Sequence, residues 1–358
     1  MKIKIFDKSG NEVLPKERIF YLPEFKLEKN FEHYMLKEIH EQPQTSKILI
    51  ESLKHEQNSV IDKIISLIYN SKKIVFIAAG SSYHASLIAS HLFRKLGFES
   101  FAIIASEYEE FNYDKNTLVF AVSQSGETMD TIIAVKNLKD KVNKIVSVIN
   151  IPHSTLHRLA DYSIEIKAGI EKCVAATKTY TNQVITFFYL AKLLGMNLDL
   201  EKIPKEISES IKENEDKIKN NFAPMLKSLN NLFIIGRSVN YYSSLEIALK
   251  LKEISYIHAE ALYGGELKHG TLALIDENSC VLALNPYWDK HIKTNIEEVK
   301  ARGAKVLEIP KDFYVNSDYP YFSLYSVIIG QLLTYYIAKE KNLPIDYPRN
   351  LAKSVTVI

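Results

Sequence analysis

Two short polar segments in the first half of the chain have the composition of a phosphate-binding site. The first, SQSGET at 123–128, follows an apolar run at 118–122 and precedes a stretch of helical character at 129–139. Free backbone N–H groups at a helix start, the positive end of the helix dipole and several hydroxyls together suit a phosphate monoester. An ordinary helix cap rich in serine and threonine has the same composition and stays open as the alternative.

The second segment, Gly80-Ser81-Ser82, follows another apolar run at 73–79 in the same way. Because the carboxyl ends of parallel strands meet at one sheet edge, we expect its hydroxyls to lie beside the first segment. Neither segment is a G-x-G-x-x-G fingerprint or a glycine loop followed by lysine. A small phosphorylated ligand therefore fits better than a nucleotide.

Acids and bases form a second candidate group in the later part of the chain. Glu246, Lys250 and Glu253 share one face at helical spacing, a pattern that most helices place in solvent as salt bridges. The segment that follows, 258–270, is crowded with acids, bases and glycines, which is more typical of an active site. Moving a proton between adjacent sugar carbons needs a carboxylate base, and opening a cyclic hemiketal needs a donor such as the imidazole of His269.

The chain ends in an apolar segment, 350–358, whose one lysine is Lys353. Most termini fray, so a terminus that stays apolar to its last residue is predicted to be docked. Lys353 is then a candidate amine nucleophile. A lysine on the surface is the alternative interpretation.

The elements that would position these groups recur along the chain as apolar, β-branched runs separated by helix-like segments. The runs lie at 73–79, 118–122, 145–149, 232–236, 280–284 and 304–309. This alternation predicts parallel sheets, and the last three runs follow the first three at a spacing of about 160 residues, which indicates a duplicated domain. Helices are predicted at 35–42, ending at Pro43, at 45–70 and at about 182–220.

These patterns divide the chain into four predicted parts. They are an N-terminal arm at 1–44, a first α/β domain with the phosphate cradle at 45–215, a second at 216–340 and a closing tail at 341–358.

The composition excludes several classes of protein. With 46% hydrophobic and 25% charged residues among 358, the chain should fold compactly, and a net charge of +2 is too small to recruit nucleic acid. Cys173 and Cys280 lack metal-ligand spacing, so we predict a reducing compartment and no metal site. No apolar run approaches about 18 residues, which predicts a cytoplasmic protein without a membrane partner.

The chain resembles the SIS (sugar isomerase) domain family, and more closely the isomerase half of the glucosamine-6-phosphate synthases. The resemblance extends over nearly the whole chain. Its motifs are MLKEI at 35–39, EQP at 41–43, GSS at 80–82, SQSGET at 123–128, Val174 with Thr177 and Lys178, LKLKEISYIHAE at 249–260, GELKHG at 265–270 and the segment 348–357. It implies an α/β fold of two tandem SIS domains, each a parallel sheet flanked by helices in three layers, like a flavodoxin.

The resemblance also implies the residues that bind the substrate. Those that hold the sugar phosphate would be Ser82, Ser123, Gln124, Ser125 and Thr128. Ser81 and the backbone of Val174 would contact the sugar.

The catalytic roles come from the same resemblance. Lys353 would form an imine with the C2 carbonyl of open-chain fructose 6-phosphate, and Glu253 would move the proton from C1 to C2. Glu246 and Lys250 would support these two groups. His269 would come from the neighbouring subunit to assist ring opening, which implies a homodimer with a shared site.

The implied reaction converts fructose 6-phosphate and ammonia to glucosamine 6-phosphate without a metal or organic cofactor. Full-length synthases carry a glutaminase domain that begins with a cysteine, and neither cysteine here is near the start, so ammonia is expected from a missing domain, a partner or solution. Departures from the family pattern are Ala176 for a serine that touches the sugar, Ala79 for a common cysteine, and Thr271 for a usual proline.

Two alternatives remain at this point. One is a stand-alone phosphosugar isomerase or glucosamine-6-phosphate deaminase, which would use the same site. The other, from a different class, is a non-catalytic sensor that binds a sugar phosphate, which would not need Glu253, His269 and Lys353.

Overall fold

The computed structural model describes residues 5–6, 10–13, 27 and 30–357. The remaining residues of the predicted arm, 1–4, 7–9, 14–26 and 28–29, lie outside the described part. Within the arm, β1 (Ile5–Phe6) pairs antiparallel with β2 (Glu12–Val13).

Two α/β units follow. The first contains, in chain order, α1 (Tyr34–His40), α2 (Gln42–His55), α3 (Asn58–Tyr69), β3 (Lys73–Ala78), α4 (Gly80–Lys95), β4 (Ser100–Ile104), η1 (Ala105–Glu110), β5 (Thr117–Ser123), α5 (Met129–Leu138), β6 (Lys144–Ile149), α6 (Thr155–Leu159), β7 (Tyr162–Glu165) and α7 (Lys178–Leu193). The second contains α8 (Ile203–Lys217), η2 (Ile218–Phe222), α9 (Ala223–Leu226), β8 (Asn231–Gly236), α10 (Val239–Lys250), η3 (Leu251–Ser255), β9 (His258–Tyr263), η4 (Gly264–His269), η5 (Thr271–Leu274), β10 (Cys280–Leu284), α11 (Ile292–Lys300), β11 (Lys305–Ile309) and α12 (Phe322–Glu340).

Each unit is built on a parallel sheet, as the alternation of apolar runs predicts. The strand order is β4-β3-β5-β6-β7 in the first sheet and β11-β10-β8-β9 in the second, with every pair parallel. With β3 matched to β8, the order β4-β3-β5-β6 of the first sheet corresponds to β9-β8-β10-β11 of the second. The duplication of the α/β unit is therefore confirmed. In each sheet the chain reverses its direction of winding beside the first strand, where such folds bind ligands.

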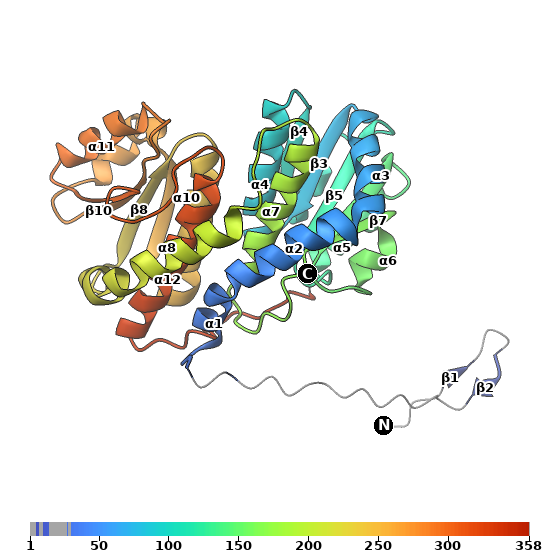
Figure 1. Cartoon of the computed structure of the whole chain (residues 1–358), viewed down its shortest axis with the longest axis horizontal. Helices are drawn as coiled ribbons and strands as arrows, with labels where there is room; N and C mark the ends of the chain where they lie inside the picture. Colours follow the sequence, from blue (N-terminus) through green and yellow to red (C-terminus); the bar gives the residue numbers. More distant parts are fainter. Residues whose placement is uncertain (1–4, 7–9, 14–26, 28–29, 358) are drawn as a thin grey trace.

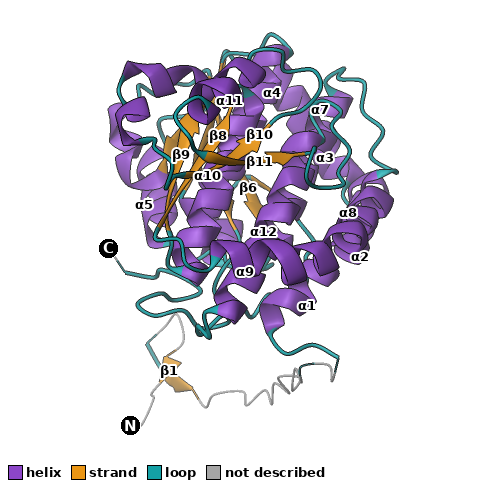
Figure 2. Cartoon of the chain, turned by 90° about the vertical axis from the view of Figure 1, so that its left-hand side faces the viewer, coloured by secondary structure: helices purple, strands orange, loops and turns teal. Residues whose placement is uncertain are grey.

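Long helices join the two units. In Figure 1, α7, α8 and α12 lie between the two sheets, and Figure 2 shows helices packed around the strands when the molecule is turned by 90°. Residues 322–338 of α12 are all buried. Gly330 in this helix lets α10 approach closely, because a Cβ there would lie 2.5 Å from Cγ1 of Ile247. This packing fixes the position of α10, which carries the charged residues.

The helix predictions need three corrections. Pro43 does not end a helix but occupies the first turn of α2, where its missing N–H costs nothing. The stretch 45–70 contains the end of α2 and all of α3, with a break at 56–57, and 182–220 is interrupted between α7 and α8. Besides the two-residue strands β1 and β2 of the arm, three strands of the parallel sheets, β4, β7 and β9, were not predicted.

Candidate active site

The polar loop between β5 and α5 brings several hydroxyl groups together in a cradle, and binding of phosphate there stays a prediction. The Oγ of Ser123 lies 2.9 Å from Oγ1 of Thr128 and accepts the N–H of Gly126 at 3.1 Å. Ser125 Oγ accepts the N–H of Glu127 at 3.1 Å. Gly126 has φ of +65°, and a Cβ there would lie 2.0 Å from Ser154 Oγ, so the loop needs glycine at this position.

The second hydroxyl-rich segment begins α4 at the same edge of the sheet, because β3 and β5 are neighbours. Gln183 of α7 donates a hydrogen bond from Nε2 to Ser82 Oγ at 3.0 Å. Ser81 instead points to the second unit, where its Oγ donates to Glu246 Oε1 at 2.8 Å. The cradle side and the charged helix are therefore in direct contact.

The predicted charged face of α10 is buried, and its alternative as a solvated face is wrong. The side chains of Glu246 and Lys250 are 0% and 1% exposed. Lys250 Nζ lies 3.4 Å from Glu246 Oε1 and 2.6 Å from Glu253 Oε2, and donates to Ser81 Oγ at 3.1 Å. His84 of α4 completes the cluster, with Nδ1 at 2.7 Å from Glu246 Oε2.

Burial and charge compete within this cluster. Burial alone raises the pKa of Glu246, but Lys250, His84 and Ser81 outweigh it and hold the pKa below its ordinary value. Burial lowers the pKa of Lys250, and the carboxylates of Glu253 and Glu246 reverse this and raise it. Glu246 and Lys250 thus form a buried ion pair, and Glu253 adds a second carboxylate at its partly exposed edge.

Glu253 lies on η3, a π-helical turn that continues α10. Such turns are frequent at functional sites. The turn ends at Tyr256, which has left-handed φ of 55°. Glu253 borders a cleft of about 380 Å³ between η3 and the C-terminal tail, so it faces open space, unlike the buried Glu246 and Lys250.

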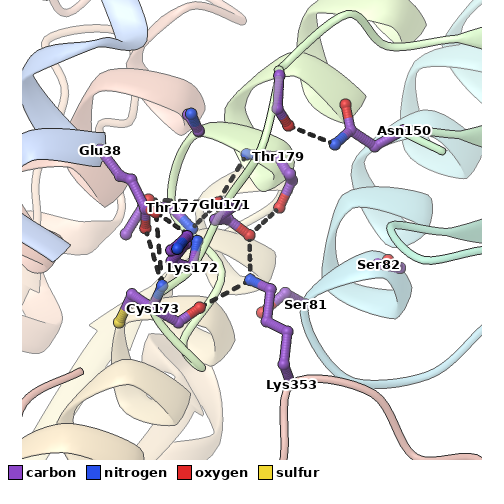
Figure 3. A network of polar contacts seen from close by, with 12 residues as sticks. Glu38, Ser81, Ser82, Asn150, Glu171, Lys172, Cys173, Thr177, Thr179 and Lys353 are labelled. Atoms are coloured by element: carbon purple, nitrogen blue, oxygen red, sulfur yellow. Dashed lines mark hydrogen bonds and ion pairs between the residues drawn. The ribbon is translucent and has the colours of Figure 1, made fainter. Parts of the chain in front are cut away.

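The tail carries Lys353 into the first unit. Its Nζ lies 2.5 Å from Oε2 of Glu171 and donates to the carbonyl oxygen of Cys173 at 2.8 Å. The side chain of Lys353 is 27% exposed, whereas Glu171 has no exposed side-chain surface. The interpretation of Lys353 as an ordinary surface lysine is therefore wrong. Figure 3 shows the pair within a larger polar network.

Glu171 is held by donors just before and at the start of α7. Its Oε1 accepts the N–H groups of Thr177 at 2.9 Å and Thr179 at 3.1 Å, and its Oε2 accepts the hydroxyl of Thr179 at 2.8 Å. Burial raises the pKa of Glu171, but Lys353 and these donors outweigh it and lower the pKa.

A second carboxyl group, Glu38 of α1, lies behind this pair. It accepts the backbone N–H of Lys172 at 2.5 Å and that of Cys173 at 3.3 Å. Burial, together with the negative charge of Glu171, raises the pKa of Glu38 to about 8. Lys353 thus lies at the edge of a network that contains two buried carboxyl groups.

The tail is docked, as predicted, but not through its apolar side chains. Ser354 Oγ donates to Ser125 Oγ at 3.1 Å, and the carbonyl of Val355 accepts the N–H of Met129 at 3.1 Å. In Figure 1 the C-terminus accordingly lies beside α5. Val355 and Val357 are 53% and 70% exposed, so hydrogen bonds hold the tail in place.

Two predicted residues need separate description. His269 is exposed at the end of η4, and no contact recorded among the described residues joins it to the two clusters. The N–H of Val174 donates to the carbonyl of Asp346 at 3.1 Å, so a sugar contact at Val174 would fall to its carbonyl oxygen.

The sequence analysis missed three residues of the site: Glu171, Glu38 and His84. Glu38 lies in the MLKEI motif that contributes to the family resemblance, but no chemical role was assigned to it. Glu171 stands three residues before Val174, and only its position beside a motif could have drawn attention to it. His84 follows the GSS segment at one helical turn from Gly80, which is a usable signal for a residue at the same sheet edge.

The paired parallel sheets and the hydroxyl cradle at one sheet edge define a class of α/β proteins with a ligand site at the strand ends. The model of the SIS domain matches residues 67–193 and 225–311, one segment in each unit. The chain belongs to the SIS domain family.

Curated relatives carry one name. The chain is 38% identical over 366 residues to the isomerizing glutamine–fructose-6-phosphate aminotransferase of Sulfurisphaera tokodaii, and 40% identical over 376 residues to that of Thermococcus kodakarensis. These matches cover 98% and 96% of this chain but 62% and 61% of the relatives. The chain thus spans about three fifths of the length of the curated relatives it matches.

Solved structures agree with this placement. The C-terminal domain of glucosamine-fructose-6-phosphate aminotransferase from Francisella tularensis superposes with a TM-score of 0.77 at 31% identity, covering 90% of this chain and all of that one. Glucosamine-6-phosphate deaminase from Thermotoga maritima shares the fold, with a TM-score of 0.77 at 24% identity and 90% and 99% coverage. Among the described residues, no helix is long and apolar enough to cross a membrane.

Proposed function

We propose that the chain converts fructose 6-phosphate and ammonia to glucosamine 6-phosphate through an imine on Lys353. One observation carries this proposal: Ser354 bonds to Ser125 in the cradle while the adjacent Lys353 is held by Glu171. The primary amine of Lys353 is therefore adjacent in sequence to the residue that contacts the cradle, the part of the site suited to the sugar phosphate. The relatives with the same name over nearly the whole chain support the same reaction.

The cradle is proposed to bind the substrate phosphate. The hydroxyl groups before α5 and the positive end of its helix dipole favour a dianion. The proposed ligands of the phosphate are Ser82, Ser123, Gln124, Ser125 and Thr128. Ser81 and Val174 would contact the sugar chain, which has to extend from the cradle toward Lys353.

The chemistry then proceeds in three steps. The amine of Lys353 attacks C2, and loss of water leaves an imine, which is more electrophilic than the ketone. Ammonia adds to C2 and releases the lysine amine. Glu253 removes a proton from C1 and returns one to C2, which turns the ketose imine into the 2-amino aldose. Lys250 and Glu246 hold Glu253 in place.

His269 is proposed to act in the site of a second subunit. The exposed position of His269, and the absence of any recorded contact with the catalytic clusters in the described residues, support a shared site in a homodimer. The ammonia source is proposed to be a glutaminase domain or subunit, because the chain spans about three fifths of its relatives. We also propose a cytoplasmic location. The predicted boundaries at 45–215 and 216–340 enclose both matched SIS segments, but they cut α2 and α8, each of which belongs to a single unit.

The proposal is tested by incubating the chain with fructose 6-phosphate, with and without ammonium, and identifying products by mass. Glucosamine 6-phosphate is expected only with ammonium. Glucose 6-phosphate without ammonium would indicate a phosphosugar isomerase. The absence of both products would contradict an enzymatic role. Borohydride should trap an adduct on the parent chain but not on Lys353→Ala.

The shared site has its own test. A mixture of Lys353→Ala and His269→Ala subunits, unfolded and refolded together, should recover activity that neither variant has alone. Recovery requires that one subunit donate the imidazole to the site of the other. A mixture as inactive as its components would contradict the dimer with shared residues.

A further inference from the structure

We propose that the carboxylate of Glu171 accepts the proton of the Lys353 ammonium when the ketose phosphate binds, and so frees the amine that attacks C2. The inference deepens the proposed function and rests on it, because it concerns the step that forms the lysine imine. Glu171 is a catalytic residue in this reaction, because it exchanges protons with the reacting nitrogen of Lys353 and with the C2 oxygen.

The geometry leaves Glu171 as the proton acceptor. Lys353 Nζ has two recorded acceptors, Glu171 Oε2 at 2.5 Å and the carbonyl of Cys173 at 2.8 Å. A backbone carbonyl cannot take the proton under ordinary conditions, whereas a carboxylate can. An amine must be neutral to attack a carbonyl, so this ion pair has to be discharged before the imine forms.

Several charged groups act on the Glu171 carboxylate from the surrounding elements. Glu38 on α1 repels its negative charge, and Lys250 on α10 attracts it. Lys178 on α7 acts on Glu38 and forms an ion pair with Glu41 at 2.6 Å. The donors before and at the start of α7, Thr177 and Thr179, stabilise the anion directly. In the free protein these groups keep Glu171 charged and paired with Lys353.

Substrate binding changes that balance by removing water. The side chain of Lys353 is 27% exposed in the free protein, whereas that of Glu171 is fully buried. A sugar that covers this surface desolvates the ion pair, and burial in a low-dielectric site disfavours charged forms of both partners. The neutral pair of amine and carboxylic acid becomes accessible at the moment when the carbonyl is in reach.

The proposed step balances in protons and charge. The ammonium gives one proton to Glu171, and the nitrogen lone pair forms the bond to C2 as the carbonyl electrons move to oxygen. A second nitrogen proton passes to that oxygen. Glu171 then returns its proton to the C2 hydroxyl, which leaves as water, and the nitrogen lone pair forms the protonated imine. Glu171 ends the step as a carboxylate.

The test follows the rate of borohydride trapping with saturating fructose 6-phosphate between about pH 6 and about pH 9. The parent rate should change little with pH, because the proton acceptor is internal. Glu171→Gln should be slower by about a hundredfold at low pH and should accelerate as pH rises, because solvent must deprotonate the lysine. Glu171→Asp should be slower than the parent but keep the flat profile.

Controls separate this role from a structural one. Glu165→Gln, which removes a carboxylate paired with Lys167 at 2.9 Å outside the site, should behave as the parent. Glucitol 6-phosphate, which has no carbonyl, should bind Glu171→Gln as tightly as the parent by calorimetry. If the glutamine variant does not fold, Glu171→Asp decides, since its carboxylate is withdrawn by about 1.5 Å.

The outcomes distinguish this inference from the proposed function. A parent chain that yields no trapped adduct would refute the lysine imine itself. A parent that is trapped, beside a Glu171→Gln variant with the same rate and pH profile, would overturn only the role of Glu171. If only the aspartate variant folds, a trapping rate equal to that of the parent would likewise overturn only the role of Glu171.

Discussion

Glu246 and Lys250 form an ion pair one helical turn apart on α10, with Oε1 and Nζ separated by 3.4 Å and almost no side-chain surface in contact with solvent. Ser81 of the first unit bonds to both residues. The contact between the two units is therefore polar and charged at the point where the candidate site lies. Such a pair is costly to break, because removal of one member leaves the other charge buried.

Glu246→Gln is expected to destabilise the chain by about 3 kcal/mol. This is the lower end of the range for a broken buried ion pair, because Lys250 still has Glu253 as an ion-pair partner. Chemical denaturation of parent and variant measures the loss in the free energy of unfolding. Glu260→Gln, at an exposed position on β9, should change it little. Equal stability of parent and Glu246→Gln would show that the pair does not stabilise the fold.

Glu253→Gln should lose product formation by about a hundredfold or more while the imine on Lys353 still forms. The side chain of Glu253 is 21% exposed and borders the cleft, so the fold should survive. Product analysis by mass and borohydride trapping separate the two steps. Glu266→Gln, at an exposed position on η4, is the control. Loss of trapping together with turnover would assign Glu253 to imine formation instead.

Ser125→Ala should weaken binding of glucitol 6-phosphate by about tenfold, which corresponds to about 1.4 kcal/mol. The variant removes a cradle hydroxyl and its bond with Ser354. Calorimetry gives the dissociation constant, with Ser106→Ala at an exposed position as the control. An unchanged constant would exclude Ser125 from the phosphate site.

Glu38→Gln should gain stability relative to the parent as pH rises. The pKa of Glu38 is raised from 4.5 to about 8 in the folded chain, so between these values the folded state binds more protons than the unfolded state. The contribution of Glu38 to the parent's free energy of unfolding therefore falls as pH increases through that window. Glutamine does not titrate, so the variant shows no such fall. The difference in melting temperature, variant minus parent, should be larger at about pH 8.5 than at about pH 5.5.

The control for that comparison is Glu213→Gln on α8, an exposed position, whose difference should be the same at both pH values. A pH-independent difference for Glu38→Gln would mean that Glu38 is ionised throughout.

Ser238→Gly should stabilise the chain by about 1 kcal/mol. Ser238, between β8 and α10, has φ of 52° and ψ of −132°, a conformation that glycine adopts easily and that strains a residue with a Cβ by about 1–3 kcal/mol. Part of the gain is offset by the greater freedom of glycine in the unfolded chain. Ser238→Ala keeps the Cβ and should give no gain in thermal unfolding, and an equal gain in both variants would refute the strain.

Six of the strands were predictable because their sheets are covered on both faces. Runs such as that of β3 and β5 are buried throughout and therefore continuously apolar. β9 was missed because it is the edge strand of the second sheet, where His258 and Glu260 are exposed and interrupt the apolar pattern. β7 has four residues, too few for a pattern to show.

The site was predictable where its chemistry is local in sequence. The hydroxyls of the cradle and the spacing of Glu246, Lys250 and Glu253 could be identified from short segments. The acceptor of Lys353 could not, because Glu171 lies 182 residues earlier in the chain and becomes its partner only when the tail folds back. The importance of Glu38 likewise depends on burial against a segment 134 residues away.

The two sheets share one strand order, yet the hydroxyl cradle belongs to the first and the acid–base helix to the second. Under the proposed function, the loops that recognise the ligand can be redesigned without altering the helix that moves protons. Library mutagenesis aimed at another ketose phosphate would therefore vary the loop 124–128 and leave α10, η3 and their partner Ser81 intact. Under that function, selectivity and reactivity would be separable targets for engineering, because they reside in different units of the chain.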